Sequence, residues 1–376
     1  MKIKIISILI ILLLSVFSFL PVAVGVFENK CSIANKEIEL GELIEPIPVN
    51  IPSARRFHSM VCDEAHDKII LFGGATEKGL VDDTWSYDLR DNKWTKMNPS
   101  TKPSPRMGHA MTYGRGGKVV LFGGMRTNLS LSDETWVYDY AIDDWIRMNP
   151  STSPSARMYH DMTYDDCGEI ILFGGFNIKY NDETWEYDLE NDEWTKMNSP
   201  PNPSARSGHK MCDIPRLPGI LLFGGKDEYG ADDETWGFTD DWGRFDVSIK
   251  PSTRYYHAMV MNTQHSHWIL FGGTDGIIYL DDTWVFTTPF KNWTKMNPSI
   301  RPPPRAQHAM AYDEENDKVV LFGGIDSNGD YFSDTWIYDL ESDTWQIMKP
   351  KSMSIIKLDT HPVMFSLLKP LLGQYI

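Results

Sequence analysis

Arginine and histidine recur together six times in this sequence of 376 residues, always in the motif Pro-x-x-Arg-x-x-His. Guanidinium groups bind anions and imidazoles bind metal ions, so these side chains could form a site if they lined one channel. The structural alternative is that each pair fixes a strand and meets the acidic residue before a later Thr-Trp. A residue present in every repeat is most simply explained by a need that every repeat has, which favours the structural role. The arginines are Arg55, Arg106, Arg157, Arg206, Arg254 and Arg305, the histidines are His58, His109, His160, His209, His257 and His308, and the acidic residues are Asp83, Glu134, Glu183, Glu234, Asp282 and Asp334.

The motif belongs to a repeat of about fifty residues that covers most of the chain. Leu-Phe-Gly-Gly follows each histidine, and successive Gly-Gly pairs are 50, 51, 50, 48 and 51 residues apart. Thr-Trp comes next, and in five repeats another tryptophan follows nine residues later. In the second repeat these structural positions are Arg106, His109, Gly123, Gly124, Trp136 and Trp145.

Each repeat predicts four short strands. They are the Arg-x-x-His-x-Met segment, the apolar run before Gly-Gly, the Thr-Trp-x-Tyr-Asp segment and the Trp-Thr-Lys-Met segment. Aromatic and β-branched residues favour strands, and Asp, Asn, Gly and Pro favour turns between them. Such a unit cannot bury both faces alone, and radial packing of several sheets solves this. The sequence therefore predicts an all-β propeller of four-stranded blades.

These motifs resemble kelch repeats over residues 52 to about 348. The resemblance implies a kelch-type β-propeller with six clear repeats. A seventh blade built from both termini is the alternative, because residues 37–48 and 351–376 have lengths that suit further strands.

The predicted domains follow the repeat. Residues 1–25 have two lysines, an apolar run and a small-x-small site, which together indicate a signal peptide. Left uncleaved, residues 5–27 would be an N-terminal anchor, and either form exports the rest. Residues 26–51 form an N-terminal segment, 52–350 the propeller and 351–376 a tail that could be a partial blade. We expect a secreted or extracytoplasmic protein.

Composition limits the partners. The net charge of −16 disfavours nucleic acids and anionic membranes, whose phosphates require Lys and Arg. We expect a monomer, with no membrane contact beyond the N-terminal anchor. Four cysteines, Cys31, Cys62, Cys167 and Cys212, allow three disulfide pairings, between which the sequence does not choose.

Binding function is expected where the repeats differ. The loops between the second and third strands vary and share one face with the links between blades. Exposed aromatic residues among polar ones suit recognition of a protein or a glycan. The predicted binding residues are Lys78, Arg126, Lys179, Tyr180, Lys226, Tyr229, Asp275, Tyr279 and Tyr331.

No cofactor is predicted except calcium, for which Asp326, Asn328 and Asp330 resemble the opening of a calcium loop. Kelch-like propellers also include carbohydrate-active enzymes, such as galactose oxidase and sialic acid epimerases. The copper site of galactose oxidase is not reproduced here, so no catalytic residue is assigned. The primary hypothesis is a protein- or glycan-binding module, and a propeller oxidase or epimerase is the alternative.

Overall fold

The computed structural model describes residues 50–165, 168–197, 202–214, 219–287 and 292–349, and the backbone of 30–33, 36–39, 44–46 and 354–356. The chain divides into two compact units, Asn50–Lys351 and the combined segments Met1–Val49 and Ser352–Ile376. The predicted signal segment, residues 1–25, lies outside the described residues. The described part contains no apolar helix of membrane-spanning length.

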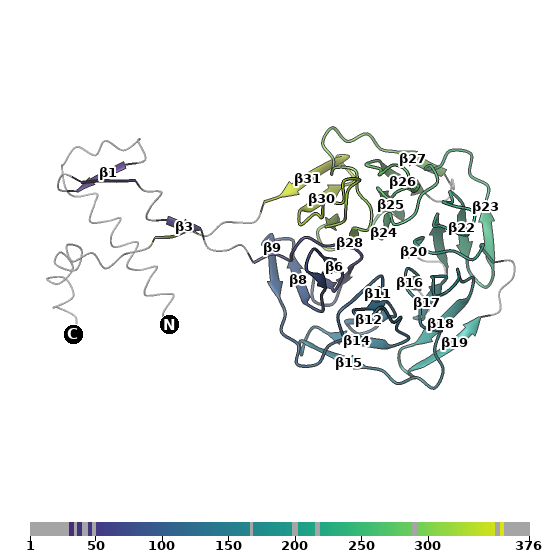
Figure 1. The fold of residues 1–376 in the computed structure, drawn as a ribbon. Coiled ribbons are helices and arrows are strands. Elements are labelled where there is room, and N and C mark those ends of the chain that lie inside the picture. The colour runs from purple at the N-terminus through teal and green to yellow at the C-terminus, as the bar shows by residue number, and fades with distance from the viewer. Residues whose placement is uncertain are drawn as a thin grey trace. The chain divides into compact units, whose positions relative to one another are not determined.

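Six antiparallel four-stranded sheets form the unit Asn50–Lys351 and are arranged as the blades of a ring (Figure 1). Each sheet consists of strands that are consecutive in the repeat, from the centre outward. The innermost strands are β4 (Ser59–Asp63), β11 (Ala110–Gly114), β16 (Asp161–Tyr164), β20 (Lys210–Asp213), β24 (Ala258–Asn262) and β28 (Ala309–Asp313). The second strands are β5 (Lys68–Phe72), β12 (Lys118–Phe122), β17 (Ile170–Phe173), β21 (Ile220–Phe223), β25 (His267–Phe271) and β29 (Lys318–Phe322).

The outer half of each blade is a hairpin. Its first strands are β8 (Thr84–Asp88), β14 (Thr135–Asp139), β18 (Thr184–Asp188), β22 (Thr235–Phe238), β26 (Thr283–Thr287) and β30 (Thr335–Asp339). Its second strands are β9 (Lys93–Lys96), β15 (Asp144–Arg147), β19 (Glu193–Met197), β23 (Trp242–Phe245), β27 (Asn292–Lys295) and β31 (Thr344–Met348). Two short two-stranded sheets accompany the first two blades. The hairpin of β6 (Ala75–Thr76) and β7 (Gly79–Leu80) forms one, and β10 (Arg106–Met107) paired with β13 (Met125–Arg126), on either side of β11 and β12 in the chain, forms the other.

The ring closes with six blades. Strand β28 of the sixth blade contacts β4 of the first. Trp94 Nε1 in the first blade donates to Thr335 Oγ1 in the sixth at 3.0 Å, as Trp145 Nε1 donates to Thr84 Oγ1 between the second and first blades at 3.0 Å. The seven-blade alternative is therefore wrong, because the sixth and first blades already contact each other directly.

Four strands outside the ring form two separate pairs. Strand β1 (Lys30–Ile33) pairs with β2 (Lys36–Glu39), and β3 (Ile44–Pro46) pairs with β32 (Ser354–Ile356). These strands belong to the unit of Met1–Val49 and Ser352–Ile376.

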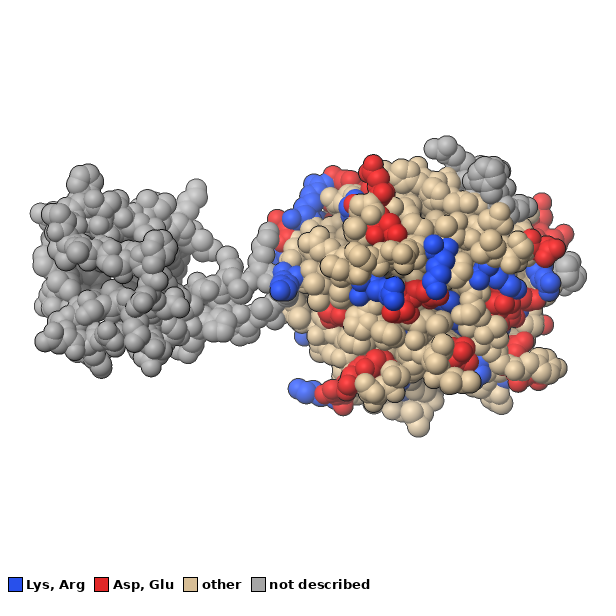
Figure 2. All heavy atoms as spheres, turned by 90° about the horizontal axis from the view of Figure 1, so that it is seen from above, with Lys and Arg blue, Asp and Glu red and all other residues tan. Residues whose placement is uncertain are grey.

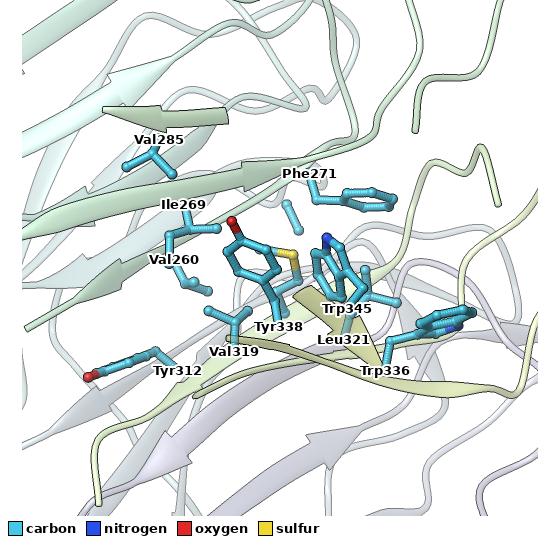
Figure 3. Close-up of a cluster of buried hydrophobic side chains, with 12 residues drawn as sticks. Val260, Ile269, Phe271, Val285, Tyr312, Val319, Leu321, Trp336, Tyr338 and Trp345 are labelled. Carbon is cyan, nitrogen blue, oxygen red and sulfur yellow. The ribbon is translucent and has the colours of Figure 1, made fainter. Parts of the chain in front are cut away.

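The hydrophobic core lies between adjacent blades. Phe271 and Val285 of the fifth blade pack in one cluster with Leu321, Trp336 and Trp345 of the sixth (Figure 3). Leu321 and Phe271 are fully buried, and each apolar side chain removed from water in this way contributes about 1.5–3 kcal/mol. One blade thus supplies only half of each core layer, which is why a single repeat could not be stable.

The Gly-Gly pairs lie where adjacent blades meet. Gly123 has φ of 74°, and a Cβ there would lie 2.7 Å from the carbonyl oxygen of Arg157 and 2.7 Å from His160 Cε1 in the next blade. Gly124 has φ of 94°, and its Cβ would lie 3.0 Å from His109 Cβ. Any larger residue would separate the blades, so glycine is needed both for its backbone conformation and for its size.

Candidate binding face

The repeated arginines brace the blades. Arg106 is fully buried, and its guanidinium donates to Glu134 Oε2 at 2.7 Å and to the carbonyl oxygen of Gly123 at 3.0 Å. Trp136 Nε1 donates to the same carboxylate oxygen at 3.2 Å. Burial would raise the pKa of Glu134, but the hydrogen bonds from Arg106 and Trp136 outweigh it and lower that pKa to about 2. The same ion pair joins each arginine to its acidic residue in all six blades, as a structural role for these residues requires.

The repeated histidines surround the axis. His109 is buried, and its ring lies against Phe72 of the preceding blade with 5.5 Å between ring centroids. Burial, assisted by the charge of Arg106, lowers the pKa of His109 to about 3. The backbone of Phe72 acts in the opposite direction, although neither ring nitrogen forms a hydrogen bond of normal geometry. No group of three or more His, Cys, Asp or Glu suited to a metal ion occurs among the described residues.

Three aromatic rings close the channel at one end. Phe57, Tyr159 and Tyr256, each directly before a repeated histidine, have ring centroids 4.7, 4.9 and 5.1 Å apart. Gly108 and Gly208 occupy this position in the blades between them, where a Cβ would lie 2.7 or 2.8 Å from a tyrosine ring. All six residues at this position have positive φ, and their backbones form a closed circle of hydrogen bonds of 2.8–3.0 Å. The sequence analysis missed this closure.

We call the end of the ring with these aromatics the loop face. It also carries the loops from the second to the third strand, 75–81, 125–132, 176–181, 226–232, 274–280 and 325–333, and the links between blades, because antiparallel strands bring both to one end. With the channel closed, this face has no open pore at its centre.

Several predicted binding residues contact other residues of the loop face. Arg126 forms an ion pair with Glu134 at 3.2 Å and donates to Ser132 Oγ at 2.9 Å. Tyr180 packs against Phe176, and the ammonium of Lys226 lies 5.3 Å from the ring centroid of Tyr255.

The other predicted residues differ in exposure. Lys78, Lys179 and Tyr229 are exposed at loop tips, and Tyr229 is 89% exposed. Tyr279 and Tyr331 are half-buried, and Tyr331 lies beneath the guanidinium of Arg56.

Two acidic residues accept hydrogen bonds from their own loops. The Asp275 carboxylate accepts from the backbone N–H groups of Ile277 and Ile278, which lower its pKa. The Asp326 carboxylate accepts from the backbone N–H groups of Asn328 and Asp330, both at 2.9 Å. The calcium hypothesis for Asp326, Asn328 and Asp330 stays a prediction.

The loop face concentrates exposed apolar side chains. Of the ten large hydrophobic residues that are exposed in the described structure, seven lie on this face. Ile178 is 95% exposed and Ile277 is 87% exposed, on the third and fifth blades. The seven are Leu129, Ile178, Tyr229, Ile249, Ile277, Ile278 and Ile300, which follow one another from the second blade to the link between the fifth and sixth. We call these residues the apolar arc.

A cavity of about 490 Å³ lies within this arc, between the third and fourth blades. Aromatic and aliphatic side chains, Phe176, Ile178, Tyr180 and Tyr229, line it together with one basic residue, Lys179, and the acidic residues Asp182, Asp227 and Glu228. The sequence analysis selected Tyr180 and Tyr229 but missed the isoleucines. The sequence placed these isoleucines in variable loops but gave no signal that their side chains face water.

Charged side chains of both signs are mixed over the side of the ring seen in Figure 2. Some charged residues of the outer strands are paired, since Lys196 forms an ion pair with Glu183 and Arg244 with Glu234. Of the cysteines, Cys62 and Cys212 are free thiols, and the side chains of Cys31 and Cys167 lie outside the described residues.

Comparison with known families agrees with this architecture. Residues 44–225 and 151–300 match the KLHDC2/KLHL20/DRC7 Kelch-repeats domain, and residues 238–366 match the Attractin/LZTR1 beta-propeller. The chain belongs to the kelch-repeat family. Kelch propellers generally mediate protein interactions.

Among curated relatives, this kelch chain is similar to Kelch domain-containing protein 2 of Bos taurus, with 29% identity over 125 residues, which is 33% of this chain and 30% of that protein. It is 33% identical to Adagio-like protein 3 of Oryza sativa subsp. japonica over 136 residues, which is 33% of this chain and 21% of that protein. It is 30% identical to an F-box/kelch-repeat protein of Arabidopsis thaliana over 154 residues, 37% of this chain and 31% of that protein. The matches thus span less than a third of each relative.

Proposed function

We propose that this kelch propeller is an exported binding module whose loop face docks a partner protein. The apolar arc carries the proposal, since it places seven exposed hydrophobic residues on one face of the ring. Exposed apolar side chains that gather in this way mark interaction surfaces, because they gain free energy only when a partner removes them from water.

The chemistry of the arc favours binding over catalysis. Acid and base catalysts usually have pKa values shifted by burial and by close charged neighbours. Two carboxylates of the cavity, those of Asp182 and Glu228, are instead exposed, and Asp227 accepts hydrogen bonds from the backbone of its own loop. These carboxylates are suited to attract a cationic partner rather than to transfer protons.

Glycan binding is the second candidate, and the cavity beside Tyr180 and Tyr229 favours it. Aromatic rings next to carboxylates can stack on sugar rings and accept hydrogen bonds from their hydroxyl groups. Export rests on the charged and apolar pattern of residues 1–25.

Affinity capture with three matched proteins tests the loop face. The wild type, Ile178→Asp with Ile277→Asp, and Ile142→Asp would be immobilised and exposed to envelope and supernatant fractions of the source cells. Ile142 is 62% exposed on the turn between β14 and β15, at the opposite end of the ring, and therefore serves as the control. We expect one partner to bind the wild type and the Ile142 variant but not the double variant.

A purified partner and a glycan array would then be titrated against the same three proteins. Sugar binding that Tyr229→Ala abolishes would select the glycan candidate. A partner that binds all three proteins equally would contradict the loop face as the binding surface. Detecting the chain only in the cytoplasm, by fractionation, would contradict export.

A further inference from the structure

A surface ion pair recurs on the loop face. In the first, fourth and fifth blades, the aspartate two residues before the threonine of Thr-Trp pairs with a basic residue of the following link. That basic residue comes directly before the proline of the next Pro-x-x-Arg motif. In these blades the chain itself neutralises the aspartate. The pairs are Asp82 with Lys102 at 3.1 Å, Asp233 with Lys250 at 2.8 Å and Asp281 with Arg301 at 2.8 Å.

The third blade has the aspartate without its cation. Asp182 occupies the same position, but the residue before the proline is Asn202. The side-chain amide of Asn202 donates to the backbone carbonyl oxygen of Asp182 at 3.3 Å, and no basic residue of the described chain lies within ion-pair distance of the Asp182 carboxylate. The second blade also lacks the pair, since Ser153 follows Asp133, but only Asp182 belongs to the lining of the cavity between the third and fourth blades.

Two further carboxylates line the same cavity. Asp227 Oδ1 accepts the backbone N–H of Tyr229 at 2.8 Å and Asp227 Oδ2 accepts the hydroxyl of Ser204 at 3.2 Å, so this carboxylate is held in one orientation. Glu228 is exposed beside it in the chain. Neither group forms an ion pair with a residue that the structure describes. The three carboxylates outnumber Lys179, the basic residue of the lining, so the cavity attracts cations.

The walls of the cavity are aromatic and aliphatic. Tyr180 packs against Phe176 with 5.2 Å between ring centroids, and Ile178 and Tyr229 are exposed at the tips of the two loops that form the cavity. Aromatic rings beside carboxylates suit a guanidinium, which stacks on ring faces and donates two parallel N–H groups to a carboxylate. The volume of about 490 Å³ is within the range of about 300–1,000 Å³ that is typical of ligand sites.

We propose that this cavity receives an arginine side chain of the docking partner, and that apolar residues beside that arginine cover Ile178 and Tyr229. The inference rests on the proposed function and specifies the chemistry of the partner. The arginine supplies the cation that Lys102, Lys250 and Arg301 supply in other blades. The chain has 52 acidic and 36 basic residues, and this excess favours the approach of a cationic segment.

Peptide titration tests the cavity. The probes are an acetylated and amidated leucine-arginine-leucine peptide, its lysine counterpart and its citrulline counterpart, which has the shape of arginine without the charge. Each would be titrated with the purified full chain and followed by the NMR signals of the peptide. We expect saturable binding of the arginine peptide and about 10-fold weaker binding of the citrulline peptide, because a charge-assisted hydrogen bond is lost. The lysine peptide should have an intermediate affinity, since an ammonium gains less from the rings.

Two lysine substitutions separate the cavity from the overall charge. Asn202→Lys restores the basic residue of the other blades beside Asp182 and should weaken binding of the arginine peptide about 5-fold, because the carboxylate then has an internal partner. Ser153→Lys adds the same charge at the same position of the second blade and should bind the peptide like the wild type. Asp182→Asn removes the carboxylate itself and replaces Asn202→Lys if circular dichroism shows that variant to be unfolded.

Equal affinity for the arginine and citrulline peptides, tighter binding of the lysine peptide or no saturable binding to the wild type would overturn the proposal. An equal loss in Asn202→Lys and Ser153→Lys would also overturn it, since the effect would then be one of overall charge. A captured partner that binds the loop face but is insensitive to Asn202→Lys would overturn this inference and leave the proposed function intact. Peptide binding that Asn202→Lys weakens, without any captured partner, would support the arginine site and contradict the proposed function.

Discussion

Arg106 and Ile178 represent two regions of this propeller with opposite surroundings. Arg106 is a charged residue that is 0% exposed, with its guanidinium bonded to Glu134 and to Gly123. Ile178 is an apolar residue that is 95% exposed at a loop tip. The framework that recurs in every blade buries even its charges and pairs them, whereas the loop tips leave apolar groups in water. This contrast indicates that the framework serves stability and that the tips are available to a partner.

Acid should have the largest effect on stability, and this effect should come from the framework rather than from the loop tips. The six framework histidines have pKa values below 6.5, about 3 for His109 and His308, chiefly because burial disfavours their charged form. The unfolded chain takes up protons near pH 6.5 and the folded chain does not, so the free energy of unfolding should fall as pH drops from 6.5 toward 3. Each histidine contributes up to about 1.4 kcal/mol per pH unit.

Urea unfolding at pH 7, 6 and 5 measures this effect. His109→Asn should reduce the slope, because it removes one buried neutral imidazole. A free energy of unfolding that is constant between pH 7 and 5 would show that the histidines are not buried in their neutral form.

Removal of a tryptophan between blades should have the next largest effect. Trp145 is 1% exposed, packs 4.9 Å from Phe72 of the preceding blade and donates to Thr84. Trp145→Ala should lower the free energy of unfolding by about 3–5 kcal/mol, in thermal or urea melts. Trp185→Ala should cost less, because Trp185 is only half-buried. Equal losses would contradict the packing assigned to the second tryptophan.

Removal of a framework charge should lower the free energy of unfolding somewhat less than Trp145→Ala does. Arg106→Met leaves Glu134 partly buried without its main partner and should cost about 3 kcal/mol at pH 7 in urea melts. Arg126→Met is the control, since Arg126 meets the same carboxylate from a half-exposed loop position and should cost under about 1 kcal/mol. If Arg126→Met lowered the free energy of unfolding more than Arg106→Met, the loop residue rather than the framework residue would be the main partner of Glu134.

Substitutions at the loop tips should have the smallest effect on the free energy of unfolding. Ile178→Asp should change the free energy of unfolding by less than about 0.5 kcal/mol, because the side chain makes few contacts that folding creates. The measurement is a urea melt beside the wild type. A large loss would mean that the apolar arc is part of the folded core rather than a docking surface.

The sequence by itself determined the repeat, the presence of four strands in each blade and the pairing of Arg106 with the acidic residue before Thr-Trp. It placed the innermost strand too early, because that strand begins only after the repeated histidine, while the segment with the arginine contacts the neighbouring loops. These features depend on local spacing, since a glycine or an arginine at the same place in each repeat meets the same neighbours. It also indicated the variable loops, including those that carry Tyr180 and Tyr229.

Only the tertiary structure decided the number of blades, the closure of the channel and the membership of the apolar arc. Six blades result from direct contact between β28 and β4, which lie more than two hundred residues apart. Phe57, Tyr159 and Tyr256 meet at the axis only because the ring brings alternate blades together. Ile178 and Ile277 look like core residues in a sequence, because local composition does not tell whether a loop tip turns toward neighbouring blades or toward water.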